Sequence, residues 1–209
     1  MTDPARPGDV APGPQLDAGD FGPWLTTMQA ALRGEVATDV PCGGCTACCT
    51  SSQFVHVGPD EVTTLARIPA ALRFPAPGLP RGHVVLGYDE RGRCPMLVKD
   101  RCSIYDDRPR ACRTYDCRVF AATGIEIPEA TKKDIAARVA RWRFSRPSGA
   151  DRARMLAVQS AARFLHDHPE VAGTSSPTQV AVLAIRIHSV FVDDESPGIE
   201  AIRGLMNPG

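Results

Sequence analysis

The sequence predicts an α+β fold in which a small cysteine-rich module with short β-hairpins packs on C-terminal helices. All eight cysteines of the 209-residue chain lie within residues 42–117. The same stretch contains short apolar runs separated by turn residues, a pattern typical of hairpins. Beyond Pro128, apolar residues recur at helical spacing. We therefore expect a disordered tail over residues 1–20, a cysteine-cluster domain over 21–124 and a helical region over 125–209 that packs on it.

The N-terminal segment has the composition of a disordered tail. Residues 1–20 are rich in Pro, Gly, Ala and Asp and contain almost no large apolar side chains. Apolar side chains then recur at helical spacing from Trp24 to Leu32, and Pro23 suits a first helical turn. Gly34 is the expected end of this helix, because glycine readily adopts the left-handed conformation that follows a last turn.

The cysteine module is predicted to alternate short strands with loops and short helices. Residues 53–57 have the composition of a strand, and residues 59–61 place two carboxylates at a helix start, where the helix dipole favours them. Residues 69–80 contain four prolines and are predicted to be a loop. Residues 83–88 and 93–98 flank a turn-forming segment, so we expect them to pair as a hairpin.

A second hairpin and a helix are expected to carry the later cysteines. A turn at residues 99–101 leads into Cys102, and Asp107-Arg108-Pro109 resembles the start of a helix that carries Cys112. Beyond Pro128 the pattern is that of helices throughout. The apolar stripes of these helices, such as the one that ends at Trp142, are expected to form core rather than a cofactor site.

The cysteines fall into two compact groups whose spacing is typical of metal sites. They are Cys42, Cys45, Cys48 and Cys49 in a CxxCxxCC run, and Cys94, Cys102, Cys112 and Cys117 at wider gaps. In a C-x-x-C pair both sulfurs can reach one metal while the intervening backbone turns its N–H groups toward the thiolates. Gly43 and Gly44 suit that turn because they have no Cβ. We therefore predict that all eight cysteines are metal ligands.

The spacing favours iron, with zinc as the alternative. Cys42, Cys45 and Cys48 match the three-cysteine run that wraps a 4Fe–4S cluster together with a remote fourth cysteine. Structural zinc is normally held by two facing C-x-x-C knuckles, and the later group contains no C-x-x-C. Eight thiolates could serve two four-coordinate sites, one polynuclear site, or one site with spare thiols.

The compartment decides between metal binding and disulfides. No basic start followed by an apolar core marks a secretory signal, and no apolar run reaches the length of a membrane span. We therefore expect a cytoplasmic protein with reduced thiols and no membrane partner, in which close cysteine pairs bind metal rather than form disulfides.

The charge distribution bears on partners. The formal net charge is zero, so nucleic acid is not an expected partner. Residues 131–163 nevertheless carry nine basic side chains against Asp134 and Asp151. A solvated helical face is one interpretation of this stretch, and a docking surface for an acidic partner or nucleic acid is the other.

Four cysteine motifs follow one another along the chain. They are Cys42-x-x-Cys45-x-x-Cys48-Cys49, Cys94-Pro95-Met96-Leu97, Cys102-Ser103-Ile104-Tyr105-Asp106-Asp107-Arg108-Pro109 and Cys112-Arg113-Thr114-Tyr115-Asp116-Cys117. In this order they resemble the bacterial CxxCxxCC cysteine-cluster family of zinc- or iron-chelating domains, often called YkgJ-like. The resemblance covers roughly residues 40–120. It implies metal binding, although Met96 stands where the family commonly has Phe.

Three functions follow as hypotheses. The first is a protein that binds iron, an iron–sulfur cluster or zinc in metal handling, redox chemistry or cluster presentation. The second is an iron–sulfur-dependent modifying enzyme, since flagellin lysine N-methylases have a similar cysteine-rich core; the chain lacks the glycine-rich strand-to-helix loop that usually binds their methyl donor. The third is a structural zinc module for protein interaction. Arg108 and Arg113 are candidates either to neutralise thiolate charge or to pair with nearby aspartates, and His56 and His83 are expected to be structural.

Overall fold

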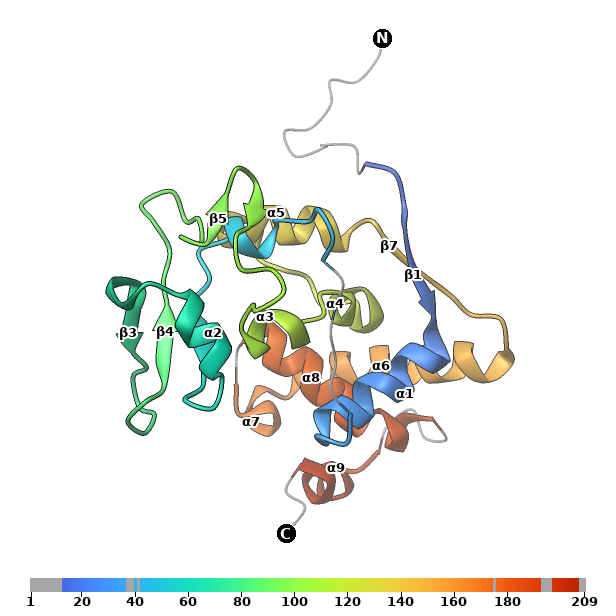
Figure 1. The fold of residues 1–209 in the computed structure, drawn as a ribbon. Helices are drawn as coiled ribbons and strands as arrows, with labels where there is room; N and C mark the ends of the chain where they lie inside the picture. Colours follow the sequence, from blue (N-terminus) through green and yellow to red (C-terminus); the bar gives the residue numbers. More distant parts are fainter. Residues whose placement is uncertain (1–12, 37–39, 41, 175, 193–196, 207–209) are drawn as a thin grey trace.

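The computed structural model has a helical part and a part made of short strands and loops (Figure 1). The structure describes residues 13–36, 40, 42–174, 176–192 and 197–206. Helices together with small sheets confirm the α+β class predicted from the sequence.

Short elements dominate the first half of the chain, and longer helices the second. The helices are α1 (Phe21–Leu32), α2 (Val62–Arg67), α3 (Arg110–Thr114), α4 (Arg118–Thr123), α5 (Glu129–Val139), α6 (Gly149–Asp167), α7 (Pro169–Ala172), α8 (Pro177–Ile187) and α9 (Ile199–Met206). The 3₁₀ turns are η1 (Cys48–Thr50), η2 (Ala70–Leu72) and η3 (His188–Phe191). The strands are β1 (Leu16–Asp20), β2 (Val55–Val57), β3 (Arg73–Pro75), β4 (Val84–Leu86), β5 (Leu97–Val98), β6 (Arg101–Cys102) and β7 (Trp142–Ser145). Among the described helices, none is both long and apolar enough to cross a bilayer.

The main core lies between α1, α4, α6 and α8. Phe21, Val158 and Ile185 are fully buried there. α6 begins at a capping box, because the Ser148 hydroxyl accepts a hydrogen bond from the Asp151 N–H at 3.0 Å, and the Asp151 carboxylate accepts one from the Ser148 N–H at 3.2 Å. α1 therefore packs with the C-terminal helices, although the cysteine run follows it in sequence.

A three-stranded antiparallel sheet in the order β2-β4-β3 forms the framework of the cysteine-rich half. Strand β2 and helix α2 lie where the sequence predicts a strand over 53–57 and a helix start over 59–61. A separate small core packs on this sheet. Its buried members are Val57, Ile68, Leu86, Met96 and Ile104.

The two expected hairpins have different outcomes. The pairing of residues 83–88 with 93–98 is wrong, because β4 is the central strand of its sheet and both of its edges are taken by β2 and β3. The second hairpin is confirmed, since β5 pairs with β6 in antiparallel fashion. Its turn residues Lys99 and Asp100 have φ of 49° and 57°, as a two-residue hairpin loop requires.

The strand pair β1–β7 corrects two further predictions. Of the tail expected over residues 1–20, residues 1–12 lie outside the described part of the chain, and residues 16–20 form β1 rather than a disordered segment. β7 interrupts the region over 125–209, which we expected to be helical throughout. The two strands pair in parallel and lie side by side in Figure 1. Local composition cannot show a partner strand so distant in sequence, and that pairing decides the conformation of both segments.

The basic stretch over residues 131–163 spans α5, β7 and α6. The Arg138 guanidinium lies 4.7 Å from the ring centre of Trp142, and Arg141 Nε donates to the Pro14 carbonyl oxygen at 2.9 Å. Part of this positive charge is thus engaged within the chain.

Candidate metal centre

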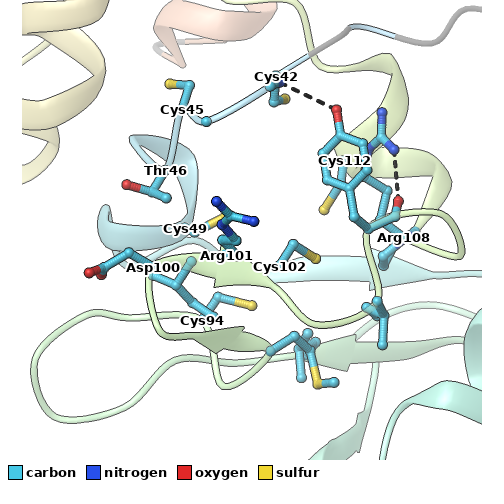
Figure 2. Close-up of a pocket in the computed structure, with 18 residues that line it drawn as sticks. Cys42, Cys45, Thr46, Cys49, Cys94, Asp100, Arg101, Cys102, Arg108 and Cys112 are labelled. Carbon is cyan, nitrogen blue, oxygen red and sulfur yellow. Dashed lines mark hydrogen bonds between the residues drawn. The ribbon is translucent and has the colours of Figure 1, made fainter.

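Six of the eight cysteines line one cavity of about 430 Å³, shown in Figure 2. They are Cys42, Cys45, Cys49, Cys94, Cys102 and Cys112. They come from the loop before η1, from η1 itself, from the β5–β6 hairpin and its approach, and from α3. The fold therefore brings the two sequence groups of cysteines together at one place.

The first run reaches the cavity through a tight turn. The Cys45 N–H donates to the Cys42 carbonyl oxygen at 3.0 Å, and Gly43 has a φ of 57°. Glycine adopts this left-handed conformation without a Cβ clash, as the sequence led us to expect. The 3₁₀ turn η1 then carries Cys48 and Cys49 as consecutive residues.

Backbone hydrogen bonds attach the second group to the first. The Cys94 N–H donates to the Cys49 carbonyl oxygen at 2.7 Å, and the Leu97 N–H donates to the Cys94 carbonyl oxygen at 2.9 Å. The chain then turns through the β5–β6 hairpin, which places Cys102 on the same wall of the cavity (Figure 2). Helix α3 brings Cys112 to the cavity from a different element.

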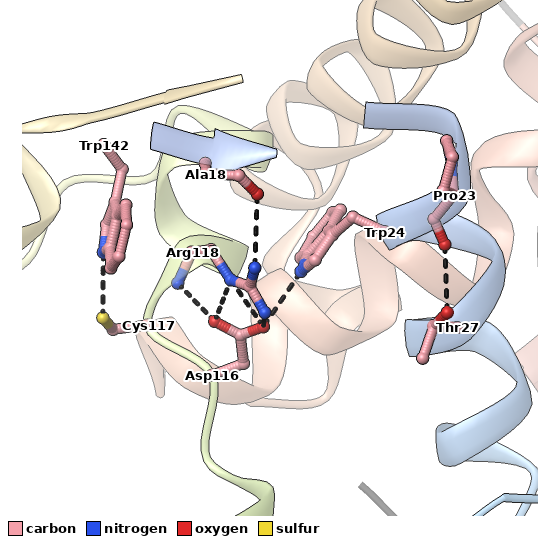
Figure 3. A network of polar contacts seen from close by, with 8 residues as sticks. All are labelled: Ala18, Pro23, Trp24, Thr27, Asp116, Cys117, Arg118 and Trp142. Carbon is pink, nitrogen blue, oxygen red and sulfur yellow. Dashed lines mark hydrogen bonds and ion pairs between the residues drawn. The ribbon is translucent and has the colours of Figure 1, made fainter. Parts of the chain in front are cut away.

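Cys48 and Cys117 are absent from the described residues that line this cavity. Both pack instead against the main helical core. Cys117 immediately precedes α4, and the indole Nε1–H of Trp142 on β7 donates to its sulfur at 3.2 Å (Figure 3). The structure therefore separates these two cysteines from the thiols on the sheet side of the cavity.

A buried ion pair beside Cys117 fixes the local backbone. The Asp116 carboxylate accepts hydrogen bonds from Trp24 Nε1 at 2.9 Å and from Arg118 Nη2 at 2.7 Å. Arg118 Nη1 also donates to the carbonyl oxygen of Ala18 at 3.2 Å (Figure 3). This network joins α1 and β1 to the segment that carries Cys117.

Burial raises the pKa of several of these thiols, so that they stay protonated at neutral pH without a bound cation. It raises the pKa of Cys49 and of Cys112 to about 12, and repulsion from neighbouring thiolates adds to the effect. Burial also raises the pKa of Cys48, for which Cys117 is the strongest charged neighbour. Burial likewise raises the pKa of Cys94 and of Cys117. A cation held by these sulfurs would lower the pKa of the thiols, because it offsets the cost of a buried negative charge and the repulsion between neighbouring thiolates.

The donor set fits a thiophilic metal. Cys45, Cys48, Cys49 and the four later cysteines are free thiols, and thiolate sulfur is a ligand that thiophilic metals prefer. Among the described residues, no three Cys, His, Asp or Glu side chains already lie close enough together to hold one ion. The thiols instead face a shared cavity, and its volume of about 430 Å³ far exceeds that of a single ion. Binding would therefore require the thiol side chains to move inward.

Arg108 forms part of the cavity wall and braces two loops. It is 6% exposed, and its guanidinium lies 4.0 Å from the ring centre of Tyr105. Its Nη1 donates to the Tyr105 carbonyl oxygen at 2.7 Å and its Nη2 to the Val40 carbonyl oxygen at 3.3 Å. The Tyr105 hydroxyl in turn accepts a hydrogen bond from the Gly43 N–H at 3.4 Å. Arg108 therefore has the bracing role, and it also brings positive charge to the thiols, whereas Arg113 is not among the described residues that line the cavity.

The two histidines near the cysteines in sequence lie elsewhere in space. His56 Nε2 and His83 Nδ1 are 2.9 Å apart in a hydrogen bond, and the two rings stack. Neither is among the described residues that line the cavity. This agrees with the structural role expected for both.

Sequence reasoning missed the role of Trp142. It is an apolar stripe residue by periodicity, yet its N–H is the hydrogen-bond donor to Cys117. No local signal in the sequence indicates this, because the contact depends on the pairing of β7 with β1.

Comparison with known proteins adds a family. Residues 41–134 match a family model, CxxCxxCC, whose description is "Putative zinc- or iron-chelating domain". The matched range contains all eight cysteines and ends within α5. No curated protein and no solved structure matches the chain.

Proposed function

We propose that this metal-binding protein holds iron as an iron–sulfur cluster. Residues 41–134 match the CxxCxxCC family, whose description is zinc- or iron-chelating. The observation that carries the proposal is the cavity lined by six cysteines. Its volume of about 430 Å³ is many times the roughly 30 Å³ that one water molecule takes in the liquid, so a polynuclear group fits the space.

The surroundings suit a cluster that is shielded from water. Leu86, Met96 and Ile104 are buried and line the cavity beside the thiols. Apolar walls limit solvent access, and a nearby guanidinium such as that of Arg108 offsets the charge that several thiolates gather. A cluster here would serve redox chemistry, metal handling or presentation of the cluster to a partner.

Zinc is the second candidate. Thiolates alone bind zinc well, and the family description names zinc as well as iron. A structural zinc domain would support protein interaction and carry no redox function.

An iron–sulfur-dependent modifying enzyme is the third. A cavity of about 430 Å³ falls in the size range of small-molecule sites, so it has room for a substrate beside a metal. Transfer of a labelled methyl group by the loaded protein, from a candidate donor to a lysine of an added protein, would favour this function over a binding protein.

The test is the metal and acid-labile sulfide content of the full chain purified without oxygen, with an absorption spectrum. We expect iron with sulfide and a broad band near about 400 nm. Zinc in a colourless protein would contradict the iron–sulfur cluster and support the structural zinc domain. Absence of both metals, even after reconstitution with iron and sulfide or with Zn²⁺, would overturn metal binding altogether.

A matched pair of variants locates the metal. We expect Cys102→Ser, which removes a thiol from the cavity wall, to lose metal. His83→Ala should keep the full metal content, because His83 pairs with His56 away from the cavity. Equal metal content in the two variants would contradict the assignment of the cavity.

A further inference from the structure

Arg113 lies outside the cysteine cavity, although the sequence marks it as a candidate to neutralise thiolates. The residue before it, Cys112, does line that cavity, so two consecutive residues of α3 have different surroundings. Arg113 lines a second cavity of about 800 Å³, which has no described lining residue in common with the first. Residues of α1 and α3 contribute to its walls, and we call it the α1–α3 cavity.

The guanidinium of Arg113 has no partner within the described part of the chain. Its Nε is covered by protein and has no hydrogen-bond acceptor there, and none of the ion pairs between described residues includes this side chain. A covered donor without an acceptor is uncommon in folded proteins and calls for an explanation. Among the donors of this side chain only Nε is covered in this way, so the two Nη groups are the donors that a ligand can reach.

The other described charges that line the α1–α3 cavity are compensated. Each belongs to an ion pair, and these pairs are Arg118 with Asp116, Arg110 with Asp60, and Glu35 with Arg33. The described lining therefore keeps one uncompensated charge, the positive charge of Arg113. A guanidinium in this state favours an anion as its ligand, because the anion supplies both the opposite charge and hydrogen-bond acceptors.

An apolar stripe of α1 forms another wall of this cavity. Trp24, Met28 and Leu32 line the cavity at intervals of four residues, which places them on one face of the helix. At a rise of 1.5 Å per residue the stripe is about 12 Å long. The hydrogen bond from Trp24 Nε1 to the Asp116 carboxylate holds α1 against the segment that follows α3, so this wall is formed before any ligand binds (Figure 3). A hydrocarbon chain along the stripe would be removed from water, which favours its binding.

We propose that the α1–α3 cavity binds a small amphiphilic carboxylate, with its head group on the Nη donors of Arg113 and its apolar body along Trp24, Met28 and Leu32. A planar carboxylate matches the two parallel N–H groups that a guanidinium presents. The cavity has the size of a small-molecule site, and such sites combine apolar walls with a few placed polar groups. The site uses none of the cysteines, so it is a binding function beyond the proposed metal centre.

The test is calorimetric titration of the full chain, as purified with its metal, with decanoate at concentrations too low for micelles. We expect saturable binding of one decanoate per chain. Decanol lacks the charge and acetate lacks the apolar body, and each should bind about 10-fold more weakly or worse. Equal binding of decanol and decanoate would overturn the proposal, because the cavity would then take up hydrocarbon without recognising the carboxylate.

A matched pair of variants assigns the head group. Arg113→Met removes the charge and keeps an unbranched side chain, and it should weaken decanoate binding about 10-fold or more while decanol binding stays the same. Arg91→Met is the control, because Arg91 is exposed and is not among the described residues that line either cavity, and it should leave decanoate binding unchanged. Decanoate binding that is equal in the two variants would overturn the assignment.

Hydrogen exchange on the unchanged chain gives a second measurement that needs no variant to fold. Decanoate should slow exchange in α1 and α3 and leave the β5–β6 hairpin as it was. Slower exchange confined to other elements would overturn the site. The metal content of the same samples keeps this proposal apart from the proposed function: a chain without metal that still binds decanoate overturns only the metal centre, and a metal-loaded chain that does not bind decanoate overturns only the carboxylate site.

Discussion

The indole N–H of Trp142 donates a hydrogen bond to the sulfur of Cys117 and so links β7 to a candidate metal ligand. An N–H donor lowers the negative charge on a metal-bound sulfur and holds its orientation, and loss of such a partner typically weakens metal binding 10- to 100-fold, roughly. Trp142→Phe keeps the ring but removes the donor. We expect zinc binding that involves Cys117 to weaken by about 10-fold.

Competition against a chromophoric chelator measures this change. Urea unfolding of the metal-free variant is the control, because phenylalanine keeps an aromatic ring at this position. A matching loss of stability would mean that the substitution disturbs the fold rather than the sulfur.

Asp116 supports the same region through charge. Its side chain is 3% exposed and pairs with Arg118, whose side chain is 26% exposed. Asp116→Ala leaves this guanidinium without its carboxylate, so we expect the free energy of unfolding to fall by about 3 kcal/mol. Urea unfolding measures the change. The control Asp60→Ala breaks the exposed pair with Arg110 and should leave the midpoint of urea unfolding almost unchanged, because solvent screens this pair.

At the scale of elements, β7 is the strand that positions Trp142. Phe144 on β7 is 8% exposed and packs on Phe21 at 5.3 Å and on Trp24 at 4.7 Å between ring centres. Phe144→Ala should lower the free energy of unfolding by about 3–4 kcal/mol, because it opens a cavity among aromatic rings. Phe54→Ala is the matched control, since Phe54 is 68% exposed, and should change stability by about 0.5 kcal/mol or less. Similar losses in the two variants, measured by urea unfolding, would contradict the role of β7 in the core.

The 3₁₀ turn η3 gives the helical region an acid dependence. His188 is 5% exposed, and its Nδ1 donates to the Ile185 carbonyl oxygen at 2.8 Å. Burial lowers the pKa of His188, and the nearby Arg154 guanidinium lowers it further. The folded state therefore binds a proton less readily than the unfolded chain. The stability present above the unfolded pKa of about 6.5 is lost as the pH falls through the lower folded pKa.

Unfolding measured between about pH 7 and pH 5 tests this sign. His188→Gln should flatten the decline in stability over that interval, whereas His166→Gln, at an exposed position of α6, should leave it unchanged. A steeper decline in His188→Gln would contradict the assignment.

What the sequence predicts well is what depends on neighbours along the chain. The end of α1 near Gly34, the turn at Gly43 and the β5–β6 hairpin all follow from local residue chemistry and are confirmed. The partner of β4 and the strand β7 are not local, because each depends on a segment far away in sequence. The same limit applies to the cysteines: the run predicts metal binding, but only the folded chain shows that Cys49 lines the cavity while Cys48 packs on the helical core.

At the scale of the whole molecule, the two cores differ greatly in size. The small core on the β2-β4-β3 sheet has five buried members among the described residues, whereas the helical core extends over α1, α4, α6 and α8. A core this small gives little stability by itself, so small domains often depend on a metal. Where binding needs thiols from several short elements, the binding free energy becomes folding free energy for those elements.

Metal removal should therefore loosen the cysteine-rich half first. In hydrogen exchange followed by mass spectrometry, we expect chelator-treated protein to lose protection in β2, β4 and the β5–β6 hairpin. α6 and α8 should keep theirs, because Val158, Leu165 and Ile185 in those helices are buried among other helical residues. The metal-loaded protein, at metal concentrations about 1,000 times the dissociation constant, gains about 4 kcal/mol in the elements that the metal joins. Uniform loss of protection across α6 and α8 would show that the two cores unfold as one unit, with the metal holding the whole chain rather than one half of it.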